Sequence, residues 1–224
     1  DSTMGRYSHE NKLKDFADGK YDILLGTQMV AKGLDFENVT LVGVINADQQ
    51  LNNDDFRSQE RTFDLLTQVV GRAGRGQYKG TAVIQTCNPE NDVIQIAARQ
   101  DYDAFFKDEL KTRKMLIYPP YCDICLIGFI GENEPKVRVA SQKYTDRLKE
   151  KLSGEYNDLK IIALGPMTAR VSKISNKFRY RLILKCKNTK RFRALMNELL
   201  KYTGTDRAYN DVSVYIDINP ENII

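Results

Sequence analysis

The sequence predicts an α/β protein with two domains: a parallel-sheet α/β domain over residues 1–116 and a smaller, basic α+β domain over residues 117–224. In the first part, short apolar runs alternate with amphipathic stretches, which is typical of a parallel sheet covered by helices. Pro119-Pro120 interrupts this pattern. The charge changes there too, from 15 Lys and Arg against 18 Asp and Glu up to residue 116, to 19 against 12 beyond it.

The first domain is expected to alternate helices with short strands. Apolar runs predict strands at 22–27, 40–47 and 81–86. Helices are predicted at 8–18, 57–75, 91–99 and 102–115, with a polar loop at 48–55. Gly76 is expected to stop the longest of these helices.

The second domain is expected to follow a different order. Strands are predicted at 122–130, 159–164, 179–186 and 212–218, with helices at 135–152 and 190–202. This β-α-β-β-α-β order is that of a ferredoxin-like split βαβ sandwich. The polar segment 165–178 is expected to be an exposed loop or hairpin extension that carries basic residues.

The stretch Q-V-V-G-R-A-G-R at residues 68–75 carries the most chemistry. On helical spacing Gln68, Arg72 and Arg75 share one stripe, opposite Leu66 and Val69. The two glycines let backbone or a ligand approach closely, and planar guanidinium groups suit phosphate oxygens. One hypothesis is an arginine pair aimed at a nucleotide γ-phosphate. The other is a solvated basic helix end that complements the helix dipole.

A second motif supports the first hypothesis. The predicted strand Y-D-I-L-L-G-T at 21–27 leads into Q-M-V-A-K-G-L-D-F at 28–36. This stretch matches motif V of superfamily 2 helicases, and residues 68–75 resemble motif VI of the same proteins. Their order and separation resemble the second RecA-like lobe of those motors.

The resemblance implies roles for particular side chains. Two arginines, Arg72 and Arg75, would contact the γ-phosphate of ATP, with Arg75 as the finger that stabilises charge during phosphoryl transfer. Gln68 would couple the nucleotide to the helix. Asp35 and Gly33 would lie at the nucleotide. Nucleic-acid contacts in motif V would come from Thr27, Gln28 and Lys32.

Further landmarks narrow the resemblance to one family. The segments 54–58 and 60–63, then 119–121, 164–166, 179–185 and 217–220, resemble the primosomal protein N′ (PriA) family of superfamily 2 replication-restart DNA helicases. The resemblance covers essentially the whole chain. Two positions depart from it: Tyr180 stands where Trp is common, and Asn219 where Asp is common.

Membership would imply the C-terminal part of an ATP-dependent 3′→5′ DNA helicase that recognises stalled or branched replication forks and starts primosome assembly. The chain has no G-x-x-x-x-G-K-[ST] phosphate loop and no D-E-x-H-like box. We therefore expect ATP and Mg²⁺ to be used only by the full-length protein, and this chain alone to be inactive. Other superfamily 2 motors, and a non-catalytic DNA or protein docking module, are alternatives.

The family also implies partners: branched and single-stranded DNA, the acidic tail of the single-stranded-DNA-binding protein, and primosome proteins that load the replicative helicase. Family members bind zinc through cysteines upstream, so we expect no metal site in this chain. We expect a cytoplasmic monomer with no membrane contact, since no apolar run approaches the ~20 residues of a membrane span.

A run of basic residues occupies 170–193 without any acidic residue. It could neutralise phosphates and offer aromatic faces to unpaired bases, or bind an acidic peptide, or be the solvated side of a strand and helix. The residues expected to contact nucleic acid here are Lys173, Lys177, Arg179, Tyr180 and Arg181.

The chain has four cysteines, too few and too scattered for a disulfide framework. Cys122 and Cys125 form a C-x-x-C pair, which is the spacing of many zinc and redox sites. No second pair accompanies it. On a strand the two sulfurs would face opposite sides, so we expect structural cysteines.

Overall fold

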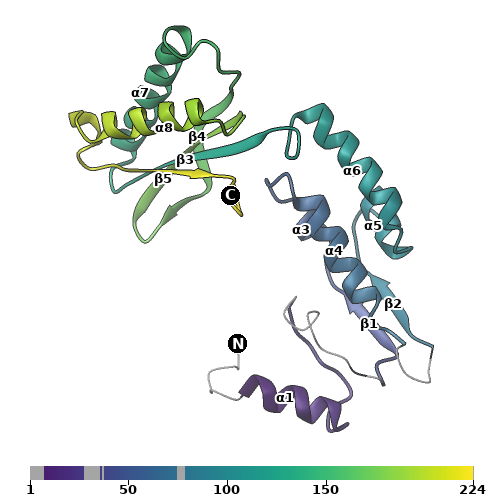
Figure 1. The fold of residues 1–224 in the computed structure, drawn as a ribbon. Helices are drawn as coiled ribbons and strands as arrows, with labels where there is room; N and C mark the ends of the chain where they lie inside the picture. Colours follow the sequence, from purple (N-terminus) through teal and green to yellow (C-terminus); the bar gives the residue numbers. More distant parts are fainter. Residues whose placement is uncertain (1–7, 28–35, 37, 75–78, 224) are drawn as a thin grey trace. The chain divides into compact units, whose positions relative to one another are not determined.

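The computed structural model describes residues 8–27, 36, 38–74 and 79–223. The described residues form two compact units, one from residues up to 53 together with 57–106, the other from 54–56 together with 107–223 (Figure 1). The sequence-based boundary at residue 116 remains a prediction. None of the described helices is long and apolar enough to cross a membrane.

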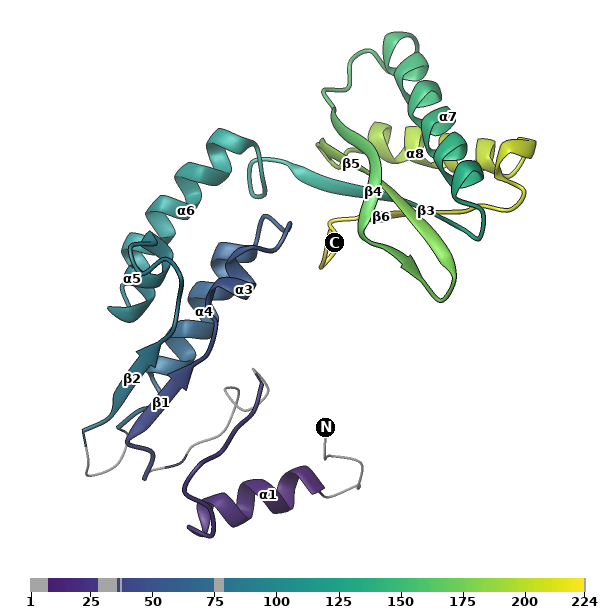
Figure 2. The same ribbon diagram turned by 180° about the vertical axis from the view of Figure 1, so that it is seen from behind.

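The first unit combines helices with a two-stranded sheet (Figures 1 and 2). Its elements are α1 (Ser8–Ala17), β1 (Leu41–Val44), α3 (Asp48–Leu51), α4 (Ser58–Val70), β2 (Thr81–Ile84), α5 (Asp92–Ala98) and the start of α6 (Tyr102–Leu116). β1 and β2 are parallel, with Leu41 opposite Thr81, as the alternating pattern predicted. α4 packs against α5 and against both strands.

The core of this unit lies between α4, α5 and α6. The rings of Phe63 and Phe105 stack with centroids 4.2 Å apart and planes 6° from parallel. Leu66, Ile94 and Ala97 are buried beside them. This packing fixes α4, and with it the segment that follows its last turn.

The predicted strand at 22–27 is wrong. Those residues have no regular secondary structure, and Ile23 and Leu25 are 84% and 83% exposed. An apolar run makes a stable strand only when a neighbouring strand satisfies its backbone groups, and within the described ranges none pairs with it. The expected loop at 48–55 is also partly wrong, because α3 occupies its first half.

The second unit follows the order predicted for it, β-α-β-β-α-β. Its elements are β3 (Asp123–Gly131), α7 (Glu134–Ser153), β4 (Ile162–Ile174), β5 (Lys177–Cys186), α8 (Lys190–Thr203) and β6 (Ser213–Ile218), with a 3₁₀ turn at Arg207–Tyr209. The strands form one antiparallel sheet in the order β4-β5-β3-β6. Both long helices cover the same face of it (Figures 1 and 2).

Alternation along the strands separates two apolar groups. On the helix side, Ile127, Phe129 and Leu182 join the main core. On the other side, Ile124 and Ile183 pack in a smaller cluster with Leu126 and Ile223 of the C-terminal segment. Because side chains alternate with a period of two, adjacent residues of one strand belong to different clusters.

The segment 165–178 extends the sheet as a hairpin rather than leaving it. β4 runs to Ile174, and β5 starts at Lys177. Between them Ser175 and Asn176 have φ of 48° and 62°, the positive values that a two-residue type I′ hairpin turn requires. Of the loop and hairpin alternatives, the hairpin extension is confirmed.

Within the second unit, a stack of side chains holds the segment 54–56 against the end of α6 and β5. The ring of Phe56 lies parallel to that of Tyr118, with centroids 5.1 Å apart. The Arg113 guanidinium lies 5.2 Å from the Phe56 centroid, and the Lys185 ammonium 3.6 Å from the Tyr118 centroid. Cation–π contacts of this kind stabilise by about 0.5–2 kcal/mol each.

Asn219, the position where the family commonly has Asp, closes β6. Its φ is 55°, in the left-handed region that Asn tolerates better than most residues. Its amide Nδ2 donates to Asp123 Oδ1 at 2.9 Å, and its Oδ1 accepts from the Ile124 amide at 3.0 Å. An Asp here would place a second carboxylate beside Asp123, which explains the amide.

Candidate nucleotide contacts and nucleic-acid surface

Helix α4 presents one of the three predicted motif VI side chains to solvent. Gln68 is exposed, while Thr62, Phe63 and Leu66 on the opposite side are buried. The helix lies against the core through this buried side. The expectation of a buried side facing away from Gln68 is therefore confirmed at Leu66.

The predicted helix at 57–75 ends earlier, at Val70. The Arg72 and Ala73 amides donate to Val69 and Val70 at 3.0 and 3.3 Å, a tighter pattern than an α-helix. Arg72 is half-buried in this turn. It therefore does not continue the helical stripe of Gln68, and that part of the prediction is wrong.

Gly74 is required where the turn meets the next segment. Its φ is +74°, and a Cβ there would lie 2.3 Å from the Gly80 backbone nitrogen. The Gly74 amide donates to the Val39 carbonyl at 3.1 Å. A residue with a side chain would be strained by its backbone angle and by this close approach. The turn that carries Arg72 is thus fixed by distant parts of the chain.

Most of the other predicted motif V and VI residues lie outside the described residues. These are Gln28, Lys32, Gly33, Asp35, Arg75 and the expected stop Gly76. Thr27 is described and is exposed. Of the named motif V residues only Thr27 belongs to the described part of the chain, so the roles of all of them stay predictions.

Asp48, which the sequence did not single out, ties together the ends of the two parallel strands. Its Oδ1 accepts from Thr86 Oγ1 and its Oδ2 from the Cys87 amide, both at 2.7 Å. The Cys87 amide, and then the Thr86 hydroxyl, hold the pKa of Asp48 below its usual value. Ligands of open α/β sheets bind at this carboxyl edge, so Asp48 braces the edge of the first unit where a ligand would lie.

The basic run at 170–193 does not form one surface. Arg181 and Lys185 are each 9% exposed. The Arg181 guanidinium donates to the Ile223 carbonyl, and Lys185 Nζ donates to the Leu116 carbonyl at 2.6 Å. Burial lowers the pKa of Lys185. Both cations are therefore used inside the unit, and a direct phosphate contact by Arg181 is not compatible with this burial.

Other basic residues of the run lie at the surface. Lys173 and Lys177 are exposed on the β4–β5 hairpin, and Arg179 is half-buried on β5. Lys173 Nζ lies 4.6 Å from the centroid of the Phe178 ring. On α8, Arg191 forms an ion pair with Asp158 at 2.8 Å. The hairpin thus carries exposed cations of the run that can meet a phosphate.

Two of the three aromatic residues within the run, Phe192 and Tyr180, are not open stacking platforms. Phe192 is fully buried. Tyr180 packs against the main core, and its hydroxyl donates to Glu134 Oε1 at 3.2 Å. Desolvation, and then this carboxylate, raise the pKa of Tyr180. The exposed aromatic residue of the sheet is instead Tyr215 on β6, 38% exposed, which the sequence analysis did not name.

The two cysteines of the C-x-x-C pair face different sides, as expected. Cys125 is buried in the main core, whereas Cys122 packs against the smaller cluster and its thiol approaches the Ile117 carbonyl at 3.2 Å. Burial raises the pKa of Cys125 to about 12, so its thiolate is disfavoured. Among the described residues no group of three or more His, Cys, Asp or Glu is placed to hold a metal ion.

Two family models match the chain. Residues 114–221 match the model described as the primosomal protein N C-terminal domain. Residues 1–77 match the model described as the helicase conserved C-terminal domain. The first match covers the antiparallel unit almost completely, and the second includes the turn that carries Arg72.

Several curated relatives, each called replication restart protein PriA, are similar to the chain. That of Bacillus subtilis (strain 168) is 41% identical over 220 residues, 98% of this chain and 27% of the relative. That of Synechocystis sp. is 40% identical over 185 residues, 83% and 22% respectively. That of Borreliella burgdorferi is 36% identical over 227 residues, 100% and 33%. The chain thus spans a fifth to a third of their length.

Proposed function

Because the chain belongs to the primosomal protein N′ (PriA) family, we propose that it is the C-terminal part of an ATP-dependent 3′→5′ DNA helicase that restarts replication at stalled or branched forks. Residues 1–116 would form a RecA-like second helicase lobe. Residues 117–224 would form a ferredoxin-like domain, a proposal supported by the strand order β4-β5-β3-β6 with two helices on one face.

The observation that carries the proposal is the fixed turn after α4, within the segment that matches the helicase model. The turn is held by the bond from Gly74 to Val39 and the close approach to Gly80. It fixes the backbone at Arg72, whose planar guanidinium suits the oxygens of a phosphate. A positioned cation of this kind can stabilise charge in phosphoryl transfer without rearranging during the reaction.

In this proposal Arg72 and Arg75 contact the γ-phosphate of ATP, and Gln68 links the nucleotide to α4. Asp35 and Gly33 approach the nucleotide from motif V. The chain supplies only part of the site, since its sequence contains no phosphate loop. We expect no ATP hydrolysis by the chain alone.

The proposal assigns nucleic-acid contacts to two regions. Thr27, Gln28 and Lys32 would touch the backbone of the strand along which the motor moves. In the second unit Lys173, Lys177 and Arg179 would neutralise phosphates, with Tyr180 as a packed neighbour. Arg181 is left out because its guanidinium is used inside the unit.

We propose that Mg²⁺ and zinc are bound only by the full-length protein. Mg²⁺ prefers carboxylate and phosphate oxygens, and the described residues offer no cluster of carboxylates, histidines or cysteines for it or for zinc. When bound, Mg²⁺ supplies neutralisation of phosphate charge.

The proposed partners are branched and single-stranded DNA, the acidic tail of the single-stranded-DNA-binding protein, and primosome proteins that load the replicative helicase. The exposed cations of the β4–β5 hairpin suit polyanions of either kind. We propose that the protein acts as a monomer.

The experiment compares variants of the full-length protein. In Arg75→Ala and Arg72→Ala, DNA-stimulated ATP hydrolysis should fall by about 10³-fold, because the loss of an arginine finger costs 10³–10⁵ in rate. Binding of forked DNA should stay within about twofold. Arg99→Ala, which removes an exposed arginine beside α5, is the matched control and should hydrolyse ATP normally.

Two results would contradict the proposal. If Arg72→Ala and Arg75→Ala both unwind forks at the wild-type rate, the arginines do not contact the nucleotide. If the wild-type full-length protein binds forks but shows no DNA-stimulated hydrolysis, the chain belongs to a docking module instead.

A further inference from the structure

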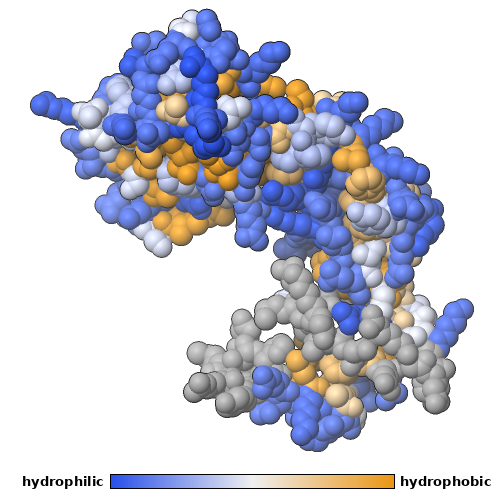
Figure 3. Space-filling model, viewed as in Figure 1, coloured by the Kyte–Doolittle hydropathy of each residue, from blue (hydrophilic) through white to orange (hydrophobic). Residues whose placement is uncertain are grey.

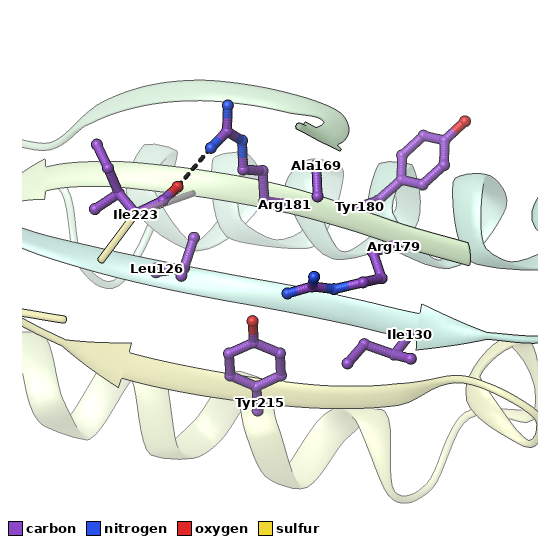
Figure 4. A pocket seen from close by; sticks show the side chains of 8 residues that line it. All are labelled: Leu126, Ile130, Ala169, Arg179, Tyr180, Arg181, Tyr215 and Ile223. Atoms are coloured by element: carbon purple, nitrogen blue, oxygen red, sulfur yellow. Dashed lines mark hydrogen bonds between the residues drawn. The ribbon is translucent and has the colours of Figure 1, made fainter. Parts of the chain in front are cut away.

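The second unit has one sheet face that no helix covers. α7 and α8 lie on the opposite face (Figures 1 and 2). Figure 3 shows apolar residues at the surface of this unit below the two helices, among hydrophilic ones. We call it the uncovered face because no helix packs on it, although Ile223 of the C-terminal segment covers part of it. It includes Leu126 and Ile130 of β3, Arg179 and Arg181 of β5, and Tyr215 of β6 (Figure 4).

Tyr215 lies flat across this face. It is paired with Gly128 in the ladder between β6 and β3, and a Cβ at Gly128 would lie 2.1 Å from the ring of Tyr215. The ring therefore rests on the strand at a position without a side chain. Glycine inside a strand often marks such a close approach. With 38% of Tyr215 exposed, the other side of the ring faces outward.

A cation lies beside the ring. Arg179 is paired with Ile130 on β3, and in Figure 4 its guanidinium extends across β3 towards the side of Tyr215. Among the described residues no carboxylate lies within ion-pair distance of Arg179. Its neighbour Arg181 differs, because its guanidinium is turned to the Ile223 carbonyl.

Charged side chains around the Tyr215 ring are distributed unevenly over this face. Asp217 is exposed two residues along β6 from Tyr215, next to Leu126. Towards the other end of the sheet, Lys177 is exposed two residues from Arg179. Two carboxylates, Glu132 and Asp211, line the same hollow as Lys177, and Asp211 forms an ion pair with Lys136. A polyanion that covers the ring would therefore run along β5 and away from Asp217.

An occupant of this site needs a flat ring with a negative charge beside it, because the Arg179 guanidinium extends across β3 towards the ring (Figure 4). An unpaired nucleotide has both, since its base can stack on an aromatic ring and its phosphate can meet an arginine. A duplex keeps its bases stacked on each other, and an acidic peptide offers carboxylates without an obligatory ring. The geometry favours an unpaired strand.

We propose that Tyr215 and Arg179 form a base-stacking site for single-stranded DNA on the uncovered face of the C-terminal sheet. Gly128 keeps the platform flat, and Lys177 extends it along the phosphates. The site rests on the proposed function, because it takes the nucleic acid of that function as its ligand. It moves the stacking role from Tyr180, on the helix side, to β6.

The test measures binding of the 224-residue chain to a fluorescein-labelled single-stranded oligonucleotide by fluorescence anisotropy. Tyr215→Leu should weaken binding at least about fivefold, since stacking contributes about 1–3 kcal/mol per base. Tyr215→Phe keeps the ring and should bind within about twofold. Tyr121→Leu removes a second tyrosine that is 38% exposed, in the turn before β3, and should leave affinity unchanged.

A salt series separates the ring from the cation. Arg179→Gln should make the slope of log affinity against log salt shallower by about 0.7, the value for one phosphate contact on a single strand. Tyr215→Leu should leave that slope unchanged. Circular dichroism of every variant checks that the fold is retained. Gly128→Ala, which pushes the ring away, should weaken binding as Tyr215→Leu does.

Equal affinity of Tyr215→Leu and wild type would overturn the site. So would a result in which an acidic peptide, and not the oligonucleotide, loses binding in these variants. Fork unwinding by the wild-type full-length protein is measured in parallel. If it unwinds forks while Tyr215→Leu binds normally, only the stacking site fails; if it shows no DNA-stimulated ATP hydrolysis, the proposed helicase function fails.

Discussion

Replacing Gly74 with alanine tests whether the turn that carries Arg72 is held as described. Two separate costs are expected. The left-handed backbone, with φ of +74°, costs about 1–2 kcal/mol for a residue with a Cβ. The new Cβ would also lie 2.3 Å from the Gly80 backbone nitrogen, and forcing such an overlap costs roughly 1–3 kcal/mol more. The total is about 2–5 kcal/mol.

Gly19 provides a matched control for this change. It has nearly the same backbone angle, φ of +73°, but nothing lies within 4 Å of its Cβ position. Gly19→Ala therefore carries the backbone cost alone, about 1–2 kcal/mol. The difference between the two variants isolates the close approach of residues 74 and 80.

Thermal unfolding followed by circular dichroism measures both variants. A change of 1 kcal/mol moves the Tm of a chain of 150–250 residues by about 2–4 °C, so Gly74→Ala should melt at least about 2 °C below Gly19→Ala. In the full-length protein Gly74→Ala should also lower DNA-stimulated ATP hydrolysis, because the turn shifts Arg72. If the two variants melt together and hydrolyse ATP equally, the close approach does not exist.

Three further predictions concern single side chains. Asp48→Asn should make the Tm fall less steeply with pH below about pH 4. The pKa of Asp48 is lowered in the folded protein, so this carboxylate contributes stability that is present above its unfolded pKa and lost as the pH falls. The Tm measured against pH tests this. Tyr144→Phe should raise the Tm by about 2–12 °C, since the hydroxyl is buried without a partner among the described residues and such burial costs about 1–3 kcal/mol. Asn219→Asp should lower stability at pH 7 by about 1 kcal/mol through repulsion by Asp123, and by less at pH 3; urea unfolding measures it.

Each of these has an opposing outcome. A steep acid limb retained in Asp48→Asn would show that other carboxylates dominate. A lower Tm for Tyr144→Phe would mean that its hydroxyl makes a bond worth keeping. Equal stability of Asn219→Asp and wild type at pH 7 would show that the two side chains do not meet.

The second unit could be predicted closely from the sequence because its signals are local. Alternation along the strands and the caps of α7 and α8 place each element, with Asn133 and Thr189 accepting from amides of the first helical turn. The hairpin turn at 175–176 could not be chosen over a loop, since Ser and Asn suit both. The structure shows the hairpin turn, because Ile174 of β4 pairs with Lys177 of β5 and leaves only residues 175 and 176 between the strands.

The first unit was harder to predict from the sequence, because the predictions that proved wrong depend on contacts between residues far apart in the chain. The helix predicted over 57–75 ends at Val70 because Gly71 and Gly74 weaken a helix and because the turn brings Gly74 to Val39 and Gly80. No local pattern reports such a contact. The strand at 22–27 failed for a similar reason: its apolar residues satisfied the pattern, but pairing depends on a neighbour.

The basic run shows a signal that could have been used. Arg179, Arg181 and Lys185 are two or four residues apart, so on a strand they share one face, and that face is the one the C-terminal segment partly covers. The sequence does not say which of them the segment reaches. Gly128 also indicated a special position, since a glycine inside a strand often marks the close approach of another group, here the ring of Tyr215.

The stack around Phe56 has a consequence for how the protein can be divided. The polypeptide leaves the first unit at residue 53, contributes 54–56 to the second, returns, and leaves again after 106. No single cut can therefore release either half intact. A fragment starting at residue 107 would lack the aromatic partner of Tyr118, so a protease acting in the loop after α5 should yield pieces that stay associated until denaturant is added.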